Sequence, residues 1–491
     1  MIHTKIVATL GPASDSIEMI GRLVDAGVDV FRLNFSHGTL EGHARTLDHI
    51  RTACRRRGSM AAVMGDLCGP KIRIDPLEDE GIPIAPGDHI EIVRGHLVGT
   101  AQRISTNRPE LVAEVDVGHR ILIDDGSIQL RVSERSADRL ACVCEVGGVI
   151  KPRKGINLPD SQLAMSALTE KDFEDLAWAL EHELDYIALS FVRSATDLRE
   201  LRERIPLANE TCRIVAKIET VQAIEHLDEI IETSDVILVA RGDLGVEMDI
   251  AQVPLLQKQI VAQCQHAGKP VIIATQMLQS MVEHPTATRA EVSDVANAIL
   301  DAADCVMLSA ETSVGAYPLE SVTMMNRIAE QTERYLKGRV ETARMDARLT
   351  MRRVTTAVAH GANLLARELD ATLVAVWTRT GNTARLLSKT RLNVPVIGLS
   401  PDASVCRRMS MYYGVLPVLL RRRTPTSAML REVDALLMQQ GRVQPGDLIV
   451  VVADTRLEQQ GATTRLLLHL VGSEADEATF PARAAGPRQE S

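Results

Sequence analysis

Short apolar runs alternate with longer amphipathic stretches through most of this chain. The apolar runs are three to six residues long, partly β-branched and bounded by polar residues or glycine, a pattern typical of strands buried on both faces of a sheet. Alternation of such strands with helices predicts a parallel sheet, and eight strands is the number in a TIM (β/α)8 barrel. The expected barrel strands cover 5–10, 28–33, 61–64, 186–189, 214–216, 236–240, 271–274 and 305–308.

The alternation stops after the third of these strands. Between residues 70 and 168 the chain is rich in glycine, proline and short alternating runs such as HRILIDDGSIQLRV, which predict antiparallel strands joined by turns. We therefore expect a β-rich lid domain inserted into the barrel, which would consist of residues 1–69 and 169–345.

A second α/β unit is expected over residues 346–472. Its strands are predicted at 372–376, 394–399, 415–420 and 448–452. A last strand at 464–470 follows a connection too short for a crossover helix, so it should be antiparallel. The polar tail 473–491 is expected to be disordered. The predicted fold class is α/β: an interrupted TIM barrel with a lid, followed by a C-terminal regulatory domain.

Composition narrows the functional class. The 491 residues carry a formal net charge of -10, which argues against a nucleic-acid partner. No apolar segment reaches the roughly 18 residues that a membrane span needs, and the N-terminus lacks the pattern of a secretion signal. We expect a cytoplasmic protein without a membrane partner, whose eight scattered cysteines are reduced thiols.

Polar side chains follow every expected barrel strand except the first. In TIM barrels the residues just past the strands form the active site, so these side chains should converge. They are Arg32, Asn34, Ser36, Asp66, Ser190, Lys217, Glu219, Arg241, Gly242, Asp243, Thr275, Ser309 and Glu311.

Lys217 and Glu219 are two residues apart at the end of one strand and should point to one side, with Asp243 just past the next strand. A structural ion pair is the simpler interpretation. The alternative is a Mg2+ or Mn2+ site, because hard cations prefer oxygen ligands. The turn around Gly242 should lead into a helix whose free amides bind an anion, and Arg32 adds positive charge. From the residues alone we infer a metal-dependent enzyme that acts on a phosphorylated acid.

Long motifs, present in family order over nearly the whole chain, resemble those of pyruvate kinases. They are TKIVATLGPAS (4–14), FRLNFSHG (31–38), GPKIR (69–73), KGINLP (154–159), KIE (217–219), ARGDLG (240–245), KPVIIATQMLQSM (269–281), TRAEVSDVANAILDAADCVMLSAET (288–312) and YPLE (317–320). The resemblance implies phosphoryl transfer from phosphoenolpyruvate to ADP, giving ATP and pyruvate in glycolysis.

The resemblance also implies roles for the residues at the barrel mouth. Glu219 and Asp243 would hold Mg2+ or Mn2+, and Lys217 would neutralise the phosphoryl group in transfer. Arg32 would contact the substrate phosphate, and the amides of Gly242 and Asp243 its carboxylate. The other implied catalytic residues are Thr275, beside the enolate, and Ser309 and Glu311, near the proton supply.

Nucleotide and monovalent-cation sites follow from the same resemblance. The nucleotide contacts would be Asn34, His37, Arg73 and Lys154, with lid residue Asp124 a weaker candidate. The oxygens of a K+ site would come from Asn34, Ser36, Asp66 and the backbone of Leu67. Family members that need K+ usually carry Glu where this chain has Lys71, which resembles the K+-independent members. We therefore expect the ammonium of Lys71 to replace K+, with a solvated Lys71 as the alternative.

In the C-terminal unit the stretch TRTGNTAR precedes a helix. Its donors, Thr378, Thr380, Gly381, Asn382 and Thr383, would bind the phosphate of an allosteric activator, although an ordinary capped turn has the same pattern. The loop 453–464 lacks the Trp and glycines of members that bind fructose 1,6-bisphosphate, so a sugar or nucleotide monophosphate is expected. The family's usual homotetramer is the expected assembly.

Two other functional classes stay open at this stage. A lyase or aldolase on the same barrel would use Lys217 as a Schiff-base nucleophile, but neighbouring carboxylates favour a charged, non-nucleophilic lysine. A binding protein that retains only the fold is the second class, and it conflicts with the filled catalytic positions.

Overall fold

In the computed structural model, residues 2–161, 166–205, 212–337, 353–420, 427–453 and 465–473 are described. The chain forms two compact units, residues 1–339 and 340–491. The predicted tail 473–491, all but its first residue, and the loop 454–464 lie outside the described residues. Among the described residues, no helix is long and apolar enough to cross a membrane.

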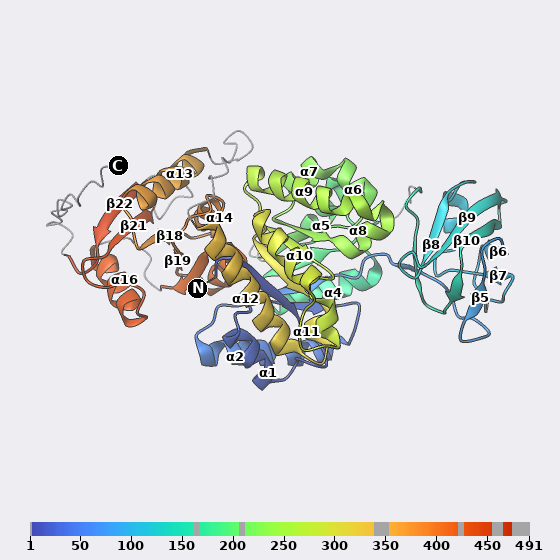
Figure 1. The fold of residues 1–491 in the computed structure, drawn as a ribbon, viewed down its shortest axis with the longest axis horizontal. Helices are drawn as coiled ribbons and strands as arrows, with labels where there is room; N and C mark the ends of the chain where they lie inside the picture. The colour runs from blue at the N-terminus through green and yellow to red at the C-terminus, as the bar shows by residue number, and fades with distance from the viewer. Residues whose placement is uncertain are drawn as a thin grey trace. The chain divides into compact units, whose positions relative to one another are not determined.

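Eight parallel strands of the first unit form a closed barrel, as predicted (Figure 1). Around the barrel the strand order is β1, β17, β16, β15, β14, β13, β3 and β2. The strands span β1 (Lys5–Thr9), β2 (Val30–Asn34), β3 (Ala62–Asp66), β13 (Tyr186–Leu189), β14 (Arg213–Ile218), β15 (Val236–Ala240), β16 (Val271–Ala274) and β17 (Cys305–Leu308).

Amphipathic helices pack against the outside of this barrel and share one large apolar core with it. Several begin with a side-chain cap; in α4, for example, Thr169 and Asp172 form a reciprocal capping box. The helices are α1 (Ile17–Asp25), α2 (Leu40–Arg57), α4 (Glu170–Glu181), α5 (Ala195–Arg204), α6 (Val221–Glu225), α7 (Leu227–Thr233), α8 (Arg241–Glu247), α9 (Val253–Ala267), α10 (Arg289–Leu300), α11 (Ala310–Ser313) and α12 (Pro318–Leu336), with 3-10 turns at Ile250–Gln252 and Gln279–Val282.

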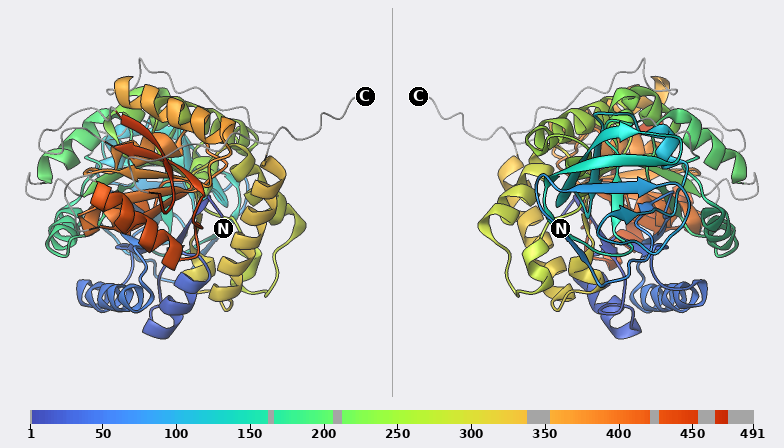
Figure 2. Two further views of the ribbon diagram at one scale, coloured as in Figure 1. Left: turned by 90° about the vertical axis from the view of Figure 1, so that its left-hand side faces the viewer. Right: turned by 90° about the vertical axis from the view of Figure 1, so that its right-hand side faces the viewer.

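The lid lies between β3 and α4 in the chain and has a hydrophobic core of its own. Most of its strands form one seven-stranded sheet in the order β4, β12, β8, β9, β10, β6 and β7, drawn in blue and cyan in the right view of Figure 2. Its elements are β4 (Ile72–Arg73), β5 (Ile82–Ile84), β6 (His89–Val93), β7 (Arg103–Ile104), α3 (Leu111–Glu114), β8 (Arg120–Ile123), β9 (Ile128–Arg135), β10 (Arg139–Val146), β11 (Gly148–Ile150) and β12 (Gly155–Asn157). The boundaries 69/70 and 168/169 stay our proposal.

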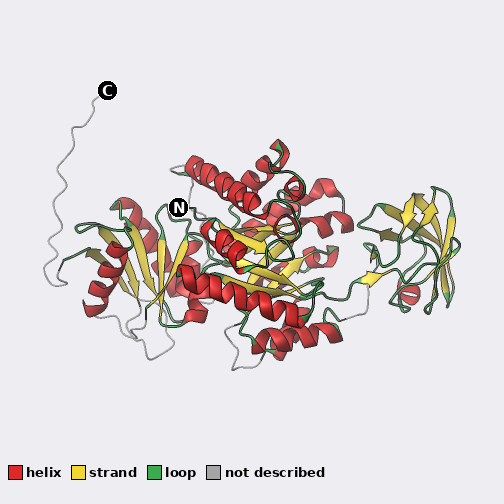
Figure 3. Cartoon of the chain, turned by 90° about the horizontal axis from the view of Figure 1, so that it is seen from below, coloured by secondary structure: helices red, strands yellow, loops and turns green. Residues whose placement is uncertain are grey.

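The second unit is a five-stranded sheet, flanked by helices in Figure 3. Four strands are parallel, and β22 pairs antiparallel with β21, which confirms the prediction from the short connection. Every second residue of β18 and β21, such as Ala375 and Ile449, points to one face of the sheet and packs in one core with Val433 and Leu437 of α16. The elements are α13 (Arg353–Glu368), β18 (Leu373–Trp377), α14 (Asn382–Ser388), β19 (Val396–Ser400), α15 (Ala403–Met409), β20 (Val415–Leu419), α16 (Ser427–Gln439), β21 (Leu448–Ala453) and β22 (Arg465–Leu470).

Candidate active site

The polar residues predicted at the strand ends converge at one mouth of the barrel, and Lys217 lies at their centre. Its Nζ donates to the hydroxyl of Ser190 (2.7 Å) and forms ion pairs with Glu219 (2.8 Å) and Asp66 (3.4 Å). Burial opposes the charged form of Lys217, but attraction by Asp66 and Glu219 outweighs it and raises the pKa of the ammonium. Lys217 is therefore a fixed positive charge.

Asp66 joins Lys217 to Arg32. The guanidinium Nε of Arg32 donates to Asp66 at 2.6 Å, and its Nη1 donates to the hydroxyl of Thr9 at 3.0 Å. Burial favours the neutral carboxyl, yet the two cations prevail and lower the pKa of Asp66. The sequence analysis was wrong to expect no polar contribution from the first strand, because Thr9 ends β1 and positions Arg32.

Glu219 is almost fully buried and is also oriented by the backbone. The amide of Phe191 donates to its second carboxylate oxygen at 2.8 Å, from a residue held at φ 54°. Such a left-handed conformation is unusual for a bulky residue and points to a local constraint. Burial and the nearby charge of Asp243 raise the pKa of Glu219, although Lys217 opposes both effects.

The charges of the Lys217 network and Asp243 do not balance. Asp66, Glu219 and Asp243 carry three negative charges, whereas Arg32 and Lys217 carry two positive charges, which leaves one negative charge. Glu219 and Asp243 are close enough for the charge of Asp243 to raise the pKa of Glu219, and both offer only oxygen donors. This donor set fits a hard divalent cation.

Thr275 and Gly242 bring the ends of β15 and β16 together. The amide of Gly242 donates to the hydroxyl of Thr275 at 2.7 Å, and this hydroxyl donates to the carbonyl of Ala274. Thr275 has a φ of 69°, and Arg241 supports it by donating to its carbonyl at 2.9 Å. As predicted, α8 begins directly after β15.

Glu311 braces the neighbouring loops. Its carboxylate, 1% exposed, accepts one hydrogen bond from the amide of Ser309 (2.8 Å) and another from the amide of Leu278 (3.0 Å). The ends of β16 and β17 are thereby tied to one buried side chain. In this geometry Glu311 orients Ser309 and its loop.

Of the predicted nucleotide contacts, Asn34 pairs in register with Asp66 at the end of β2, whereas Lys154, Arg73 and His37 have partners outside the Lys217 network. Lys154 forms an ion pair with Asp124 at 2.8 Å, and both side chains are about a third exposed or more, at 40% and 32%. Arg73 is exposed and donates to the carbonyl of Arg153. His37 is exposed on the loop after β2, where its carbonyl contacts the ring of His43.

The oxygens predicted for a monovalent cation have partners within the protein. The carbonyl of Leu67 accepts from Ser190 (2.8 Å), and the side-chain oxygen of Asn34 accepts from the amide of Ser36 (3.2 Å). Lys71 lies in the lid. Its side chain packs closely over Gly155, because a Cβ added at that glycine would lie only 2.8 Å from the Cε of Lys71. Within the described part of the chain, its ammonium has neither an ion-pair nor a hydrogen-bond partner.

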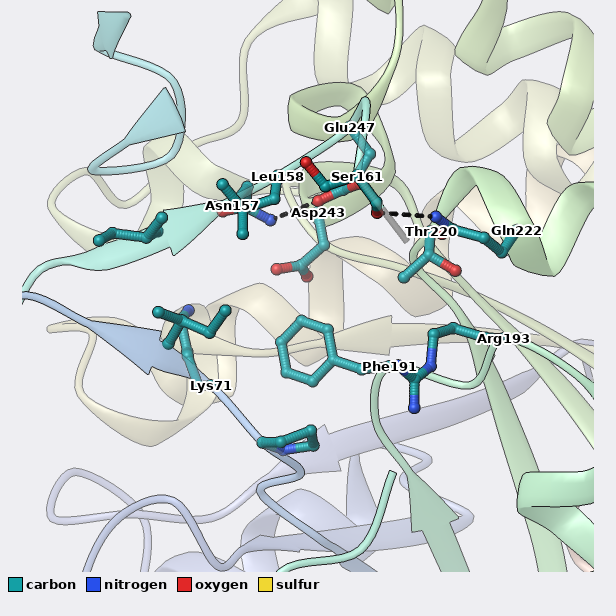
Figure 4. A pocket seen from close by; sticks show the side chains of 13 residues that line it. Lys71, Asn157, Leu158, Ser161, Phe191, Arg193, Thr220, Gln222, Asp243 and Glu247 are labelled. Carbon is teal, nitrogen blue, oxygen red and sulfur yellow. Dashed lines mark hydrogen bonds between the residues drawn. The ribbon is translucent and has the colours of Figure 1, made fainter. Parts of the chain in front are cut away.

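A pocket between lid and barrel places Lys71 across from Asp243 and Phe191 (Figure 4). Its wall includes Glu247, which accepts a hydrogen bond from Asn157 of the lid at 2.8 Å. Burial raises the pKa of Glu247 to about 7, although this hydrogen bond opposes the shift. Sequence reasoning missed Glu247; its position one helical turn after Asp243 in ARGDLGVE was the available signal.

In the second unit the predicted effector loop leads into α14. The hydroxyl of Thr378 accepts from the amide of Gly381 at 3.0 Å, and that of Thr380 accepts from the amide of Asn382 at 3.5 Å. Gly381 has a φ of 82°, and Thr383 is buried in the first turn of α14. The geometry is compatible with either a capped turn or a phosphate cradle.

Comparisons with known proteins agree over both units. The family model "Pyruvate kinase, barrel domain" matches residues 1–322, and "Pyruvate kinase, alpha/beta domain" matches residues 356–469. The pyruvate kinases of Staphylococcus aureus strains MRSA252 and USA300 are each 39% identical over 479 residues, which cover 96% of this chain and 81% of the relative. The crystal structure of a pyruvate kinase from Cryptosporidium parvum superposes with a TM-score of 0.88 at 33% identity, covering 96% of each chain.

Proposed function

The chain belongs to the pyruvate kinase family, and from that premise we propose that it transfers the phosphoryl group of phosphoenolpyruvate to ADP at the mouth of the barrel. The observation that carries the proposal is the position of Lys217, which forms ion pairs with both Asp66 and Glu219. Phosphoryl transfer needs fixed charges more than a nucleophile, and this site supplies them.

Lys217 and Arg32 act on the phosphoryl group. The raised pKa keeps Lys217 protonated at working pH, so it neutralises the charge on the group in transfer. Arg32 presents a guanidinium whose remaining donors are free of Asp66 and Thr9, and these bind phosphate oxygens. The same raised pKa argues against the Schiff-base alternative, because a protonated lysine is not nucleophilic.

Glu219 and Asp243 are the residues that would hold Mg2+ or Mn2+, because the charges of the two carboxylates interact and both offer only oxygen donors. An ion held there would supply positive charge to the substrate. The amide of Gly242, which in this structure donates to the hydroxyl of Thr275, would turn to the substrate carboxylate, and Thr275 would then lie beside the enolate that is protonated to pyruvate. Glu311 holds the loop of Ser309 in place beside these residues.

A coupled assay of ATP formation from phosphoenolpyruvate and ADP tests this function directly. We expect turnover that requires Mg2+ or Mn2+ and stops with a chelator. Absence of turnover would favour a binding protein. Trapping of a pyruvate adduct on Lys217 by borohydride would favour the lyase or aldolase class.

The nucleotide is assigned to Asn34 and His37 of the barrel and to Arg73 and Lys154 of the lid. Exposure of Arg73 and Lys154 supports a role in which they reach ADP when the lid closes and excludes water. Asp124 holds Lys154 until then.

We also propose that the enzyme needs no K+, with Lys71 supplying the single positive charge. The ammonium of Lys71, without a partner among the described residues, lines the same pocket as Asp243, which supports a charge that moves in with the lid. The cation-type oxygens of Asn34, Ser36, Asp66 and Leu67 are its proposed destination.

Finally, we propose that the loop of Thr378, Thr380, Gly381, Asn382 and Thr383 binds the phosphate of an activating sugar or nucleotide monophosphate in a homotetramer. The short donor-rich turn before α14 supports this role. Thr383→Glu should abolish activation and leave unactivated turnover in place, because a carboxylate repels phosphate. If no phosphorylated metabolite shifts the saturation curve of the parent enzyme, the effector role fails.

A further inference from the structure

The two chain segments that connect barrel and lid both reach the first turn of α4. The outgoing segment runs from Leu67 to Pro70 after β3, and the returning segment enters α4 through Thr169. Gly69 has a φ of 63°, and a Cβ there would lie 3.0 Å from the ring of Phe191. A sharp turn that only glycine fits therefore marks the start of the lid.

One buried carboxylate joins these two segments. Asp172 is 0% exposed, and its Oδ1 accepts from the amide of Gly69 at 3.2 Å. Its Oδ2 accepts from the amide of Thr169 at 2.8 Å and from the Thr169 hydroxyl at 2.6 Å. A capping box alone would need only the Thr169 side, so the bond to Gly69 is an additional function of this carboxylate.

The residues around Asp172 connect structural elements to one another. Cys68, Asp172 and Asp175 bring three metal-type ligand atoms within 4.8 Å of one another. However, Lys171 already supplies the positive charge, because its Nζ lies 2.5 Å from Asp175 and donates to the carbonyl of Phe35 at 2.9 Å. Lys171 thus ties α4 to the loop after β2, and Asp172 ties α4 to the lid.

We propose that Asp172 is a positioning residue for phosphoryl transfer: it fixes the hinge about which the lid closes over the nucleotide. The proposal rests on the nucleotide role proposed for the lid. Because both connections share one carboxylate, the lid pivots about a fixed point and delivers Lys154 and Arg73 along a defined path. Without this anchor the lid still folds on its own core but closes less accurately. Small misplacements of catalytic groups are costly in rate.

The test compares Asp172→Ala with Asp197→Ala. Asp197 makes the same capping box for α5 with Ser194. It also accepts from the amide of Arg193 and lies 4.0 Å from the guanidinium of that residue, but it has no bond to Gly69 or Thr169 among the described contacts. Both variants lose a helix cap, so both should lower the thermal midpoint. Only Asp172→Ala should lower kcat/KM for ADP, by about 10-fold or more. Binding of phosphoenolpyruvate with Mg2+ in the absence of ADP should stay within about twofold in both variants, since the barrel site is intact.

Hydrogen exchange gives a readout that does not depend on activity. In Asp172→Ala the peptides that contain Gly69 and Thr169 should exchange faster than in the parent, whereas Asp197→Ala should leave them unchanged. Asp172→Asn keeps the side-chain volume and one acceptor oxygen, so it should show a smaller change and serves if the alanine variant does not fold. Parental ADP kinetics and parental exchange at Gly69 in both Asp172 variants would overturn the hinge role. Faster exchange with parental ADP kinetics would overturn the positioning role of Asp172 in phosphoryl transfer, and it would leave the nucleotide role of the lid to be decided by Lys154.

Discussion

The barrel mouth and the lid hold their charged residues in opposite ways. At the mouth, the side chain of Lys217 is 12% exposed and those of Asp66 and Glu219 are 1% and 2% exposed, all within one ion-pair network. In the lid, Lys154 and Asp124 pair with each other while 40% and 32% exposed. The barrel charges are therefore fixed before substrate arrives, whereas the lid charges become effective only when water is excluded.

This difference sets the expected sizes of effects. A charge interaction in a buried site is several-fold stronger than the same interaction in water. Removal of one partner from a buried pair lowers the free energy of unfolding by about 3–5 kcal/mol. Exposed pairs are typically worth about 1 kcal/mol or less. Substitutions in the barrel network should accordingly cost more activity than equivalent substitutions in the lid.

The largest effect is expected for Lys217→Met. Loss of the ammonium removes the charge that neutralises the phosphoryl group, and kcat should fall by about 100-fold or more in the coupled ATP assay. The matched control is the exposed Lys258 of α9, which pairs with Asp301 at the end of α10, and Lys258→Met should keep parental turnover. Turnover of Lys217→Met within a few-fold of the parent would remove Lys217 from the mechanism.

Lys71→Glu tests whether the ammonium of this lid residue supplies the monovalent positive charge at the barrel site. The parent should be fully active with tetramethylammonium as the only monovalent cation. The variant should lose at least about 10-fold in activity there and regain it with K+, because the carboxylate removes the positive charge and K+ restores it. A parent enzyme that is nearly inert without K+ would contradict this role and return Lys71 to the group of solvated lysines.

A smaller effect is expected for Lys154→Met. The side chain of Lys154 is 40% exposed in this structure and contributes once the lid closes, so KM for ADP should rise and kcat should fall by about 10-fold. Lys151→Met changes an exposed lysine of the same lid and should have little effect. If both variants behave alike, the lid charge acts through general attraction of the nucleotide and not through Lys154.

Sequence patterns predicted the barrel because buried parallel strands leave a strong local signal: all eight expected strands are present and close in order. The Lys217–Glu219 pair was predictable for the same reason, since residues two apart on a strand share a face. Thr9, Phe191 and Asp172 were not found as site or hinge residues, because their roles depend on partners 23 to 103 residues away. Such contacts leave no periodicity in the chain.

The smallest predicted effect lies where lid and barrel meet. Burial raises the pKa of Glu247 to about 7 from a usual value of 4.5, so the folded protein holds this proton more tightly than the unfolded chain does. Below pH 4.5 the carboxyl is neutral in both states and costs nothing. As the pH rises from 4.5 to 7, stability is lost, by about 3 kcal/mol at most.

Glu247→Gln removes this loss while its amide oxygen still accepts from Asn157. The thermal midpoints of variant and parent should therefore nearly coincide at about pH 5 and separate at about pH 8, where the variant should be more stable by a few degrees. Asn157→Ala should have the opposite effect at about pH 8, because it removes a hydrogen bond that favours the carboxylate. If the thermal midpoints of Glu247→Gln and the parent differ by the same amount at about pH 5 and about pH 8, Glu247 is solvated. Its contact with Asn157 would then resemble the exposed pair of Lys154 and Asp124.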